Sequence, residues 1–387
     1  MLFRSNIQNL KKDHPWVLWF ASAAALGLVA GSIFFFWQSR QYYRPKPEAL
    51  RWYDSGLAAL REGNTVKATR SLDEALKQDP HFVMAHARLA EAWANLDFDG
   101  NAQREFLLAT PAARSLQPLD RMYLDAIHAT VTKDFPQEVS TYQKILTRLP
   151  PNQKPLGYVD LGMAYERAGD PKRALESYTR AADLDSDNPA PLMHTAILQA
   201  RQHHVAEADR AFERAQTLLS AEMNQEGLAD LDFERGYALN DGGDPVAAEP
   251  YLQKALLEAR AIPSIQLEIR ALTQLSSAAY SSGISDHNAQ AAKYAQAVEY
   301  AQDAIDLAES NQLNAWAAYG YVRLANAEIV QGHLQKAEDH VRQALQLSRD
   351  GQQLRTEAGA NLTLASIMGL REKPDQVVAP AQSALAF

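Results

Sequence analysis

The residues best suited to binding a metal ion are three histidines, His194 and the adjacent pair His203 and His204. No acidic residue or cysteine stands at ligand spacing from them, so we interpret the pair as solvated turn histidines. The sequence holds no His-Glu-x-x-His pair, no phosphate-binding Gly-Lys-Ser/Thr loop, no Gly-x-Ser-x-Gly elbow and no kinase signature set. We therefore expect a protein that is not an enzyme and that needs no metal and no cofactor.

The charge balance argues against nucleic acid as a partner. The chain has 38 basic and 47 acidic residues, a formal net charge of -9, and no basic stripe interleaved with aromatic residues. Phosphate backbones would be repelled overall, and the acidic surplus is better explained as a solubility feature of a large surface. The absence of cysteine neither requires nor excludes an oxidising compartment.

A repeated pattern of alanines, called the alanine ladder below, predicts the helices that would position any binding residues. An Ala is followed four residues later by a bulky residue and three residues after that by another Ala, so all three lie on one helical face. Small side chains there let a second helix approach closely. The pattern recurs as Ala68/Leu72/Ala75, Ala102/Phe106/Ala109, Ala174/Tyr178/Ala181, Ala208/Phe212/Ala215, Ala248/Leu252/Ala255 and Ala337/Val341/Ala344.

Each alanine ladder is preceded by a partner helix with its own signature. The clearest case has Tyr158, Leu161, Gly162 and Tyr165, followed by the turn Gly169-Asp170-Pro171 and then the ladder. On these residues the sequence resembles the tetratricopeptide repeat family over residues 47–387. The resemblance implies an all-α chain, an α-solenoid of about nine helical hairpins in which each unit contacts only its neighbours.

Two units depart from this pattern. Residues 119–149 lack the alanine ladder, and Pro136 opens the second helix, so this hairpin is predicted from length and periodicity alone. Between Ile265 and Leu307 the predicted hairpin loop is long, residues 281–288, and Ala301 replaces the bulky residue of the ladder. The sequence there predicts a longer pair of helices.

The N-terminal region predicts a membrane anchor. Residues 16–37 carry no charge over about 22 residues, enough for a helix to cross a bilayer core. Aromatic residues stand at both ends, and large rings from Phe34 to Trp37 close the run. The rival interpretation is a signal peptide cleaved near Ala21-Ser22-Ala23, but that site falls inside the apolar run. We expect a tail at 1–15, a transmembrane helix at 16–37, a linker at 38–46 and the solenoid at 47–387.

The sequence carries two further signals about the anchor, one for its orientation in the membrane and one for its pairing with a second copy. Basic residues flank both ends of the apolar run, so we rely on the usual behaviour of an early single span and expect a cell-membrane protein with a periplasmic or extracytoplasmic solenoid. Ala23, Gly27 and Gly31 recur at every fourth residue, a spacing that lets two transmembrane helices pack as a homodimer. The alternative is that small residues are simply common in such helices.

The resemblance also implies a binding surface. In the tetratricopeptide family the first helix of each hairpin lines a concave face, one residue after the aromatic or Leu slot and again four residues later. The matching positions here are Tyr53, Leu57, Met193, Ile197, Phe233, Tyr237, Val322 and Asn326. Because these are mostly apolar, a clamp for a peptide's C-terminal carboxylate is not expected, and the predicted ligand is a hydrophobic or aromatic segment of a protein or peptide. The alternative is that tight superhelical winding buries these side chains against one another.

Two function classes follow. The layout is similar to single-span bacterial repeat proteins that recruit other proteins, which predicts a membrane-anchored interaction scaffold. It also looks like the extracytoplasmic half of bacterial membrane kinases and winged-helix regulators, which predicts a sensor whose output domain is lacking. Residues 375–387 predict the second helix of a last hairpin with no charged outer face, so we expect either a truncated chain or an interface there.

Overall fold

The computed structural model describes residues 27–28, 42–371 and 376–385. Residues 42–371 and 376–385 form eighteen α-helices and two short 3-10 helices, with no strand among them. The first helices of the hairpins are α3 (Pro47–Glu62), α5 (Val83–Asn95), α7 (Pro118–Val131), α9 (Lys154–Arg167), α11 (Ala190–Arg201), α13 (Gln225–Asp241), α15 (Ile265–Ser285), α17 (Asn314–Val330) and α19 (Leu354–Leu370). The second helices are α4 (Thr65–Gln78), α6 (Asp99–Ala109), α8 (Phe135–Arg148), α10 (Pro171–Leu184), α12 (Val205–Ala221), α14 (Pro245–Ala261), α16 (Gln290–Ser310), α18 (Leu334–Asp350) and α20 (Val378–Leu385).

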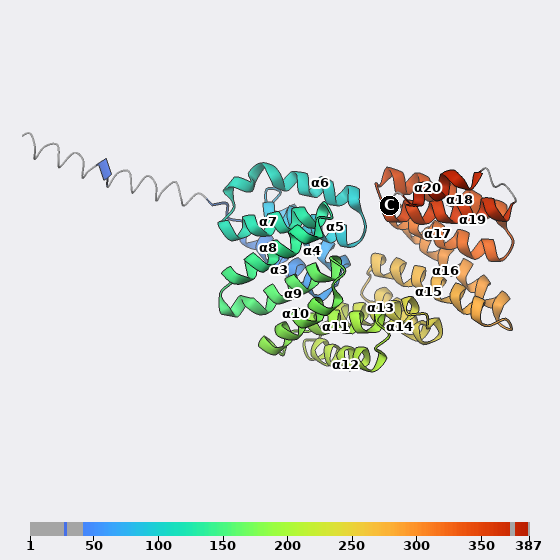
Figure 1. Ribbon diagram of the computed structural model, residues 1–387, viewed down its shortest axis with the longest axis horizontal. Coiled ribbons are helices and arrows are strands. Elements are labelled where there is room, and N and C mark those ends of the chain that lie inside the picture. The colour runs from blue at the N-terminus through green and yellow to red at the C-terminus, as the bar shows by residue number, and fades with distance from the viewer. Residues whose placement is uncertain (1–26, 29–41, 372–375, 386–387) are drawn as a thin grey trace, which may run out of the picture. The chain divides into compact units, whose positions relative to one another are not determined.

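These helices pair in chain order into nine hairpins, and consecutive hairpins pack side by side (Figure 1). The predicted all-α solenoid of about nine hairpins is therefore confirmed. The expectation that each unit contacts only its neighbours is wrong, because α3 of the first hairpin also contacts α9 and α11. Residues 45–113 and 118–387 make up one compact unit, which holds all of these hairpins. Residues 42–44 and 114–117 belong to a separate small unit, in which the Tyr43 amide donates to the Ser115 carbonyl at 3.0 Å.

Turn chemistry explains where the helices begin and end. Asn64 and Asp170 each accept a hydrogen bond at 3.0 Å from the backbone amide three residues on, the usual way of satisfying an orphan donor at a helix N-terminus. The residue before the cap adopts positive φ, +85° at Gly63 and +71° at Gly169, a conformation that glycine reaches without steric cost. A polar cap after a left-handed residue thus separates the two helices of a hairpin.

Within a hairpin, small residues meet bulky ones. Ala174, Tyr178 and Ala181 are completely buried, as the alanine ladder predicts. The facing helix offers Gly162 directly against the Tyr178 ring, where any side chain would overlap the ring. The same close approach recurs in the second half of the chain, where a Cβ at Gly236 would lie 2.7 Å from Leu252 Cγ. Such pairs let the helix axes approach and bury the apolar face of each ladder.

The two atypical units are also helical pairs. The unit without an alanine ladder forms α7 and α8, and Pro136 lies in the first turn of α8, where a proline lacks no hydrogen bond. The unit with the long predicted loop forms two helices of 21 residues each, α15 and α16. The prediction of a longer pair is confirmed, although residues 281–285 extend α15 instead of forming loop.

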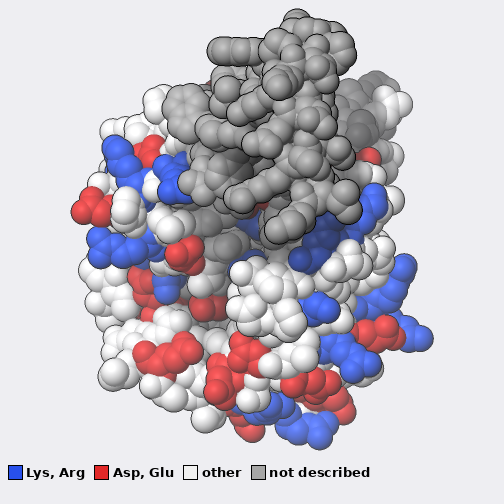
Figure 2. All heavy atoms as spheres, turned by 90° about the vertical axis from the view of Figure 1, so that its left-hand side faces the viewer, with Lys and Arg blue, Asp and Glu red and all other residues white. Residues whose placement is uncertain are grey.

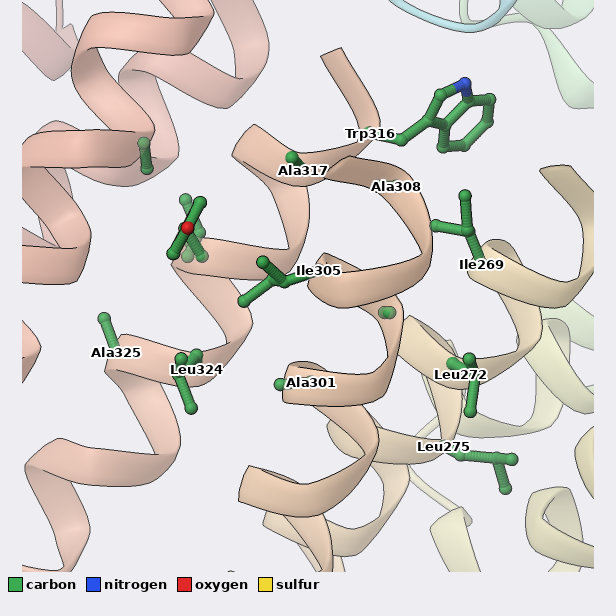
Figure 3. Packing of buried hydrophobic residues seen from close by; sticks show 14 of the residues in the cluster. Ile269, Leu272, Leu275, Ala301, Ile305, Ala308, Trp316, Ala317, Leu324 and Ala325 are labelled. Atoms are coloured by element: carbon green, nitrogen blue, oxygen red, sulfur yellow. The ribbon is translucent and has the colours of Figure 1, made fainter. Parts of the chain in front are cut away.

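The largest hydrophobic cluster fills the space between the layers of the second half, from α13 to α19. In Figure 3, apolar side chains from α15, α16 and α17 converge, among them Leu272, Ile305 and Leu324. Ile305 packs against Gly320, whose added Cβ would lie 2.8 Å from Ile305 Cγ1. The core therefore runs along the solenoid as a band between first and second helices, and leaves the opposite face of the first helices for other contacts.

The predicted membrane segment lies almost wholly outside the described residues. Of Ala23, Gly27 and Gly31, only Gly27 is described, and it is helical. Among the residues that the structure describes, we find no helix with the length and apolar character needed to cross a bilayer.

Candidate binding groove

A groove of about 730 Å³ lies along the first helices of the second half. Helices α13, α15, α17 and α19 supply most of its lining, and the rest comes from the α5–α6 turn, from Arg201 at the end of α11, and from Gly63 and Thr65 at the α3–α4 turn. These helices turn their other faces to the hydrophobic core, so residues three and four apart along each helix share the groove side. The groove is the inner surface that the repeat architecture predicts.

Aromatic side chains form its apolar part. The Phe233 and Tyr237 rings of α13 stack with centroids 6.1 Å apart and planes 9° apart. Trp316 of α17 meets Phe98 of the α5–α6 turn edge to face, with centroids 5.1 Å apart. The Tyr319 hydroxyl accepts a hydrogen bond from Gln274 at 3.5 Å. Rings with a polar edge suit a surface that contacts both apolar and polar groups of a ligand.

Arginines form the cationic part. Arg270 of α15 pairs with two carboxylates of α13, Asp230 at 3.2 Å and Glu234 at 2.8 Å, and its guanidinium lies 4.0 Å from the Phe233 ring centroid. Asp230 is 1% exposed, and one of its carboxylate oxygens has no hydrogen-bond partner. Burial, opposed by Arg270 and reinforced by Glu234, raises the pKa of Asp230 to about 7.

The other groove arginines make fewer ion pairs with carboxylates of the protein than Arg270 does. Arg323 of α17 lies 4.7 Å from the centroid of Tyr319 and donates to its hydroxyl, and the buried Nε atom of Arg323 has no hydrogen-bond partner. Arg201 is exposed, with its guanidinium 5.9 Å from the Tyr237 ring centroid. The Arg355 guanidinium donates to Asp97 at 2.8 Å, and this pair is well exposed.

The α5–α6 turn thus reaches the far end of the solenoid. Asp97 adopts a left-handed φ of +61° and pairs with Arg355, 258 residues further along the chain. In the first turn of α6, Gly100 packs against the backbone of Gly351, because an added Cβ would lie 2.8 Å from the Gly351 carbonyl oxygen. A second cavity of about 570 Å³ continues on the other side of this turn, with Asn95, Asp97, Arg201 and Arg355 lining both cavities.

The inner face of the first half is built differently, from ion pairs that cross between first helices. Arg61 of α3 binds Asp160 of α9 through two hydrogen bonds, at 2.7 and 2.9 Å, and the Asp160 side chain is 4% exposed. Burial alone would raise the pKa of Asp160, but the adjacent Arg61 guanidinium outweighs it and holds that pKa below its ordinary value. The carboxylate is therefore charged and fully used.

A second buried cluster lies next to it. Arg88 donates to Glu91 at 2.6 Å within α5, and both side chains are only 3% exposed. Arg167 of α9 donates to Glu138 of α8 through Nε at 3.0 Å, and the Thr130 hydroxyl donates to the same carboxylate at 2.9 Å. The inner charged groups of the first half therefore pair mainly with one another, although Arg88 Nε and one Glu138 oxygen have no hydrogen-bond partner.

The predicted concave-face residues differ between the two halves of the chain: those of the second half line the groove, and those of the first half do not. Phe233, Tyr237, Val322 and Asn326 all line the groove. Met193 and Ile197 of α11 lie in a hydrophobic core cluster with residues of α12 and α13, and α11 also contacts α3. In the first hairpin, Leu57 is half-buried and the Tyr53 ring packs against Phe82, with centroids 4.8 Å apart.

The groove arginines and Tyr319 are not among the predicted positions. Tyr319 and Arg323 follow from the helical register of those positions, since Tyr319 precedes Val322 by three residues and Arg323 precedes Asn326 by three. Extending the register to every third and fourth residue would have identified them. Their contacts could not have been predicted, because Arg355 meets Asp97 only through the path of the whole solenoid.

The three histidines considered as metal ligands do not form a metal site in the described structure. His194, 8% exposed, stacks on the Tyr178 ring with centroids 4.9 Å apart and bonds the Arg61 carbonyl at 3.0 Å. His203 and His204 are exposed in the α11–α12 turn. Among the described residues no group of three or more His, Asp or Glu could hold a metal ion. Figure 2 shows Lys and Arg intermingled with Asp and Glu on the part of its face that is not grey.

Comparison with known proteins agrees with this architecture. Residues 155–188, the unit that fits the repeat pattern best, match the tetratricopeptide repeat family. The chain is 28% identical over 231 residues to cellulose synthase operon protein C of Xanthomonas axonopodis pv. citri (strain 306), which covers 57% of this chain. The chain spans only 15% of the length of that relative.

Two solved structures resemble the fold. One is a signal transduction ATPase with numerous domains and a tetratricopeptide repeat sensor from Pyrococcus horikoshii, with a TM-score of 0.51, 12% identity, and coverage of 84% of this chain and 53% of that one. The other is yeast Tom70, with a TM-score of 0.51, 16% identity, and coverage of 88% and 68%. At these identities the similarity shows the fold alone. The chain is a tetratricopeptide-like helical repeat protein, an architecture suited to protein–protein interaction.

Proposed function

We propose that this protein is a membrane-anchored, non-catalytic scaffold that binds an extended segment of a partner protein along the groove of α13, α15, α17 and α19. One observation carries the proposal: two half-buried rings, Tyr237 and Tyr319, line the groove together with arginines, among them Arg201 and Arg323. A surface of this kind, presented by a rigid stack of helices, suits recognition of a chain laid along it.

Membrane anchoring is the second part of the proposal and rests on the sequence. The charge-free run at residues 16–37 would fix the solenoid to a bilayer, and the groove would then face the extracytoplasmic side. A phosphatase reporter that works only outside the cytoplasm, fused after Phe387, is expected to be active. An inactive but stable fusion would contradict this topology.

Site-directed photocrosslinking in intact membranes tests the groove directly. A benzophenone side chain placed at Tyr319 is expected to capture a discrete partner, identified by mass spectrometry. The matched control is Leu257 of α14, which is 67% exposed and does not line the groove. Equal capture from both positions would show that the groove is not the binding surface.

A substitution complements the crosslinking. Tyr237→Ala is expected to weaken capture several-fold while the circular dichroism spectrum stays unchanged, because this ring is only half-buried. Phe233 is unsuitable for this purpose, since it is 3% exposed and belongs to the hydrophobic core. Loss of the helical signal in Tyr237→Ala would assign that ring to the core instead.

A sensor is the second candidate, and the contact of the α5–α6 turn with α17 and α19 favours it. A ligand that enters the groove would meet Phe98 and Asp97 and could change their contacts with Trp316 and Arg355. A gene neighbour that encodes a kinase or a winged-helix regulator would support the sensor. Co-purification with envelope-assembly proteins would support the scaffold.

A further inference from the structure

The groove differs in charge from the protein that surrounds it. The whole chain carries a formal net charge of -9, yet the groove lining holds four arginines against two acidic residues, Asp97 and Glu234. The adjoining cavity does not add to this surplus, because its Lys133 pairs with Asp99 and its Arg167 pairs with Glu138. A positive channel inside an acidic protein concentrates anionic groups there and repels cationic ones.

These arginines are not equally available. Arg270 is held between Asp230 and Glu234 and acts as an internal cross-link. For Arg201 and Arg323, by contrast, no carboxylate of the described residues lies within ion-pair distance. Arg323 lines the groove and donates to the Tyr319 hydroxyl, so a ligand carboxylate would supply the charged partner that this guanidinium does not find among the described residues.

Arg355 is intermediate. Its partner Asp97 belongs to the α5–α6 turn, and their side chains are 70% and 38% exposed. Ion pairs as exposed as this contribute little to stability, so a second carboxylate can replace the first at small cost. Asp97 thus occupies a position that an incoming acidic side chain would also fit.

Resting on the proposed function, we propose that the partner segment is acidic and carries apolar or aromatic residues between its acidic ones. Its carboxylates pair with Arg201 and Arg323 and compete with Asp97 for Arg355. Its rings pack against Tyr237 and Tyr319. Planar guanidinium groups favour this role because they bind a carboxylate through two hydrogen bonds and also stack on aromatic faces.

Synthetic peptides test this inference on the full-length chain in neutral detergent. The probe is a fluorescein-labelled dodecapeptide in which Glu, Phe and Ser recur, amidated so that it has no terminal carboxylate. Matched probes replace every Glu with Gln or with Lys. We expect the Glu peptide to bind at least about tenfold more tightly than the Gln peptide, and its affinity to fall as salt is raised.

Variants assign the effect to the groove. Arg201→Gln and Arg323→Gln are each expected to weaken the Glu peptide about tenfold and to leave the Gln peptide unchanged. Arg201 is exposed, so that variant keeps its fold even if the half-buried Arg323 does not tolerate the change. The matched control is Arg210→Gln on α12, 71% exposed and outside the groove, which should bind as the unmodified protein does.

The failures can be told apart. Equal affinity for the Glu and Gln peptides, with both weakened by Tyr237→Ala, would overturn the acidic partner and leave the proposed function standing. Tighter binding of the Lys peptide would overturn it as well, as would competition by a DNA duplex of equal charge at equal concentration. If no peptide binds and the crosslinker at Tyr319 captures nothing, the proposed function itself fails.

Discussion

The two halves of the solenoid are built from the same kind of hairpin, but they differ in how many inner charged residues are held in internal ion pairs. In α3 to α9 the inner charged residues pair with one another across first helices, as Arg61 does with Asp160. In α13 to α19 one such pair recurs, Arg270 with Asp230 and Glu234, but the inner residues also line a groove, and Arg323 has no carboxylate of the described residues within ion-pair distance. The difference shows that a few side chains on the inner face of the first helices decide the role of a hairpin. They either hold neighbouring hairpins together or form a surface that can contact a ligand.

The largest expected effect breaks the first half. Asp160→Ala leaves the Arg61 guanidinium buried without its partner, which should lower the free energy of unfolding by about 3–5 kcal/mol. Urea titration followed by circular dichroism measures it. The contribution of the pair is present at neutral pH and is lost as pH falls through the lowered pKa of Asp160. A change below about 1 kcal/mol would show that the first half is not held by this pair.

Glycine substitutions give the next contrast. Gly56 packs on Leu72, and an added Cβ would lie 2.7 Å from Leu72 Cγ, so Gly56→Ala should destabilise the protein by about 1–3 kcal/mol. Gly359 borders the groove, with nothing within 4 Å of an added Cβ. Gly359→Ala should instead stabilise by about 1 kcal/mol through helix propensity. Thermal melting of both variants checks the pair, and destabilisation by Gly359→Ala would mean that the groove is closed there.

The buried acid of the second half gives a smaller, pH-dependent effect. The pKa of Asp230 is raised to about 7, so between about pH 4 and pH 7 the folded protein holds a proton that the unfolded chain releases. This group should therefore make stability fall by about 1 kcal/mol for each pH unit of increase across that window. Asp230→Asn should remove this slope. Parallel slopes in the two proteins, measured by urea titration at pH 5 and pH 7, would contradict the assignment.

The exposed pair between the α5–α6 turn and α19 should have the smallest effect on stability. Arg355→Ala should change the free energy of unfolding by only about 0–1 kcal/mol. Because the chain has no cysteine, spin labels at Ala94→Cys, near the end of α5, and at Thr356→Cys report the distance across this contact while Asp97 stays in place. Adding Arg355→Ala should broaden the distance distribution between the labels, and an unchanged distribution would show that the ion pair does not hold the turn.

The sequence predicted the fold well because helix pairing is a local property. The alanine ladder with a bulky residue between its alanines predicted the buried face of α10, and Ala174, Tyr178 and Ala181 are all completely buried. The groove was predicted in part. The register identified Phe233, Tyr237, Val322 and Asn326, but it could not indicate that α3 covers α11, or that Asp97 meets Arg355, because these contacts depend on the path of the whole stack.

The turns between helices carry a last consequence. Residues other than glycine adopt left-handed φ at His203, Met223 and Gln312, +60°, +54° and +58°, a conformation that disfavours any side chain. None of the three lines the groove. Met223 and Gln312 also lie far along the chain from Arg201, whereas His203 is only two residues from it. Replacing Met223 and Gln312 with glycine would relieve backbone strain away from the groove residues, so the heat tolerance of this protein could be adjusted independently of its choice of partner.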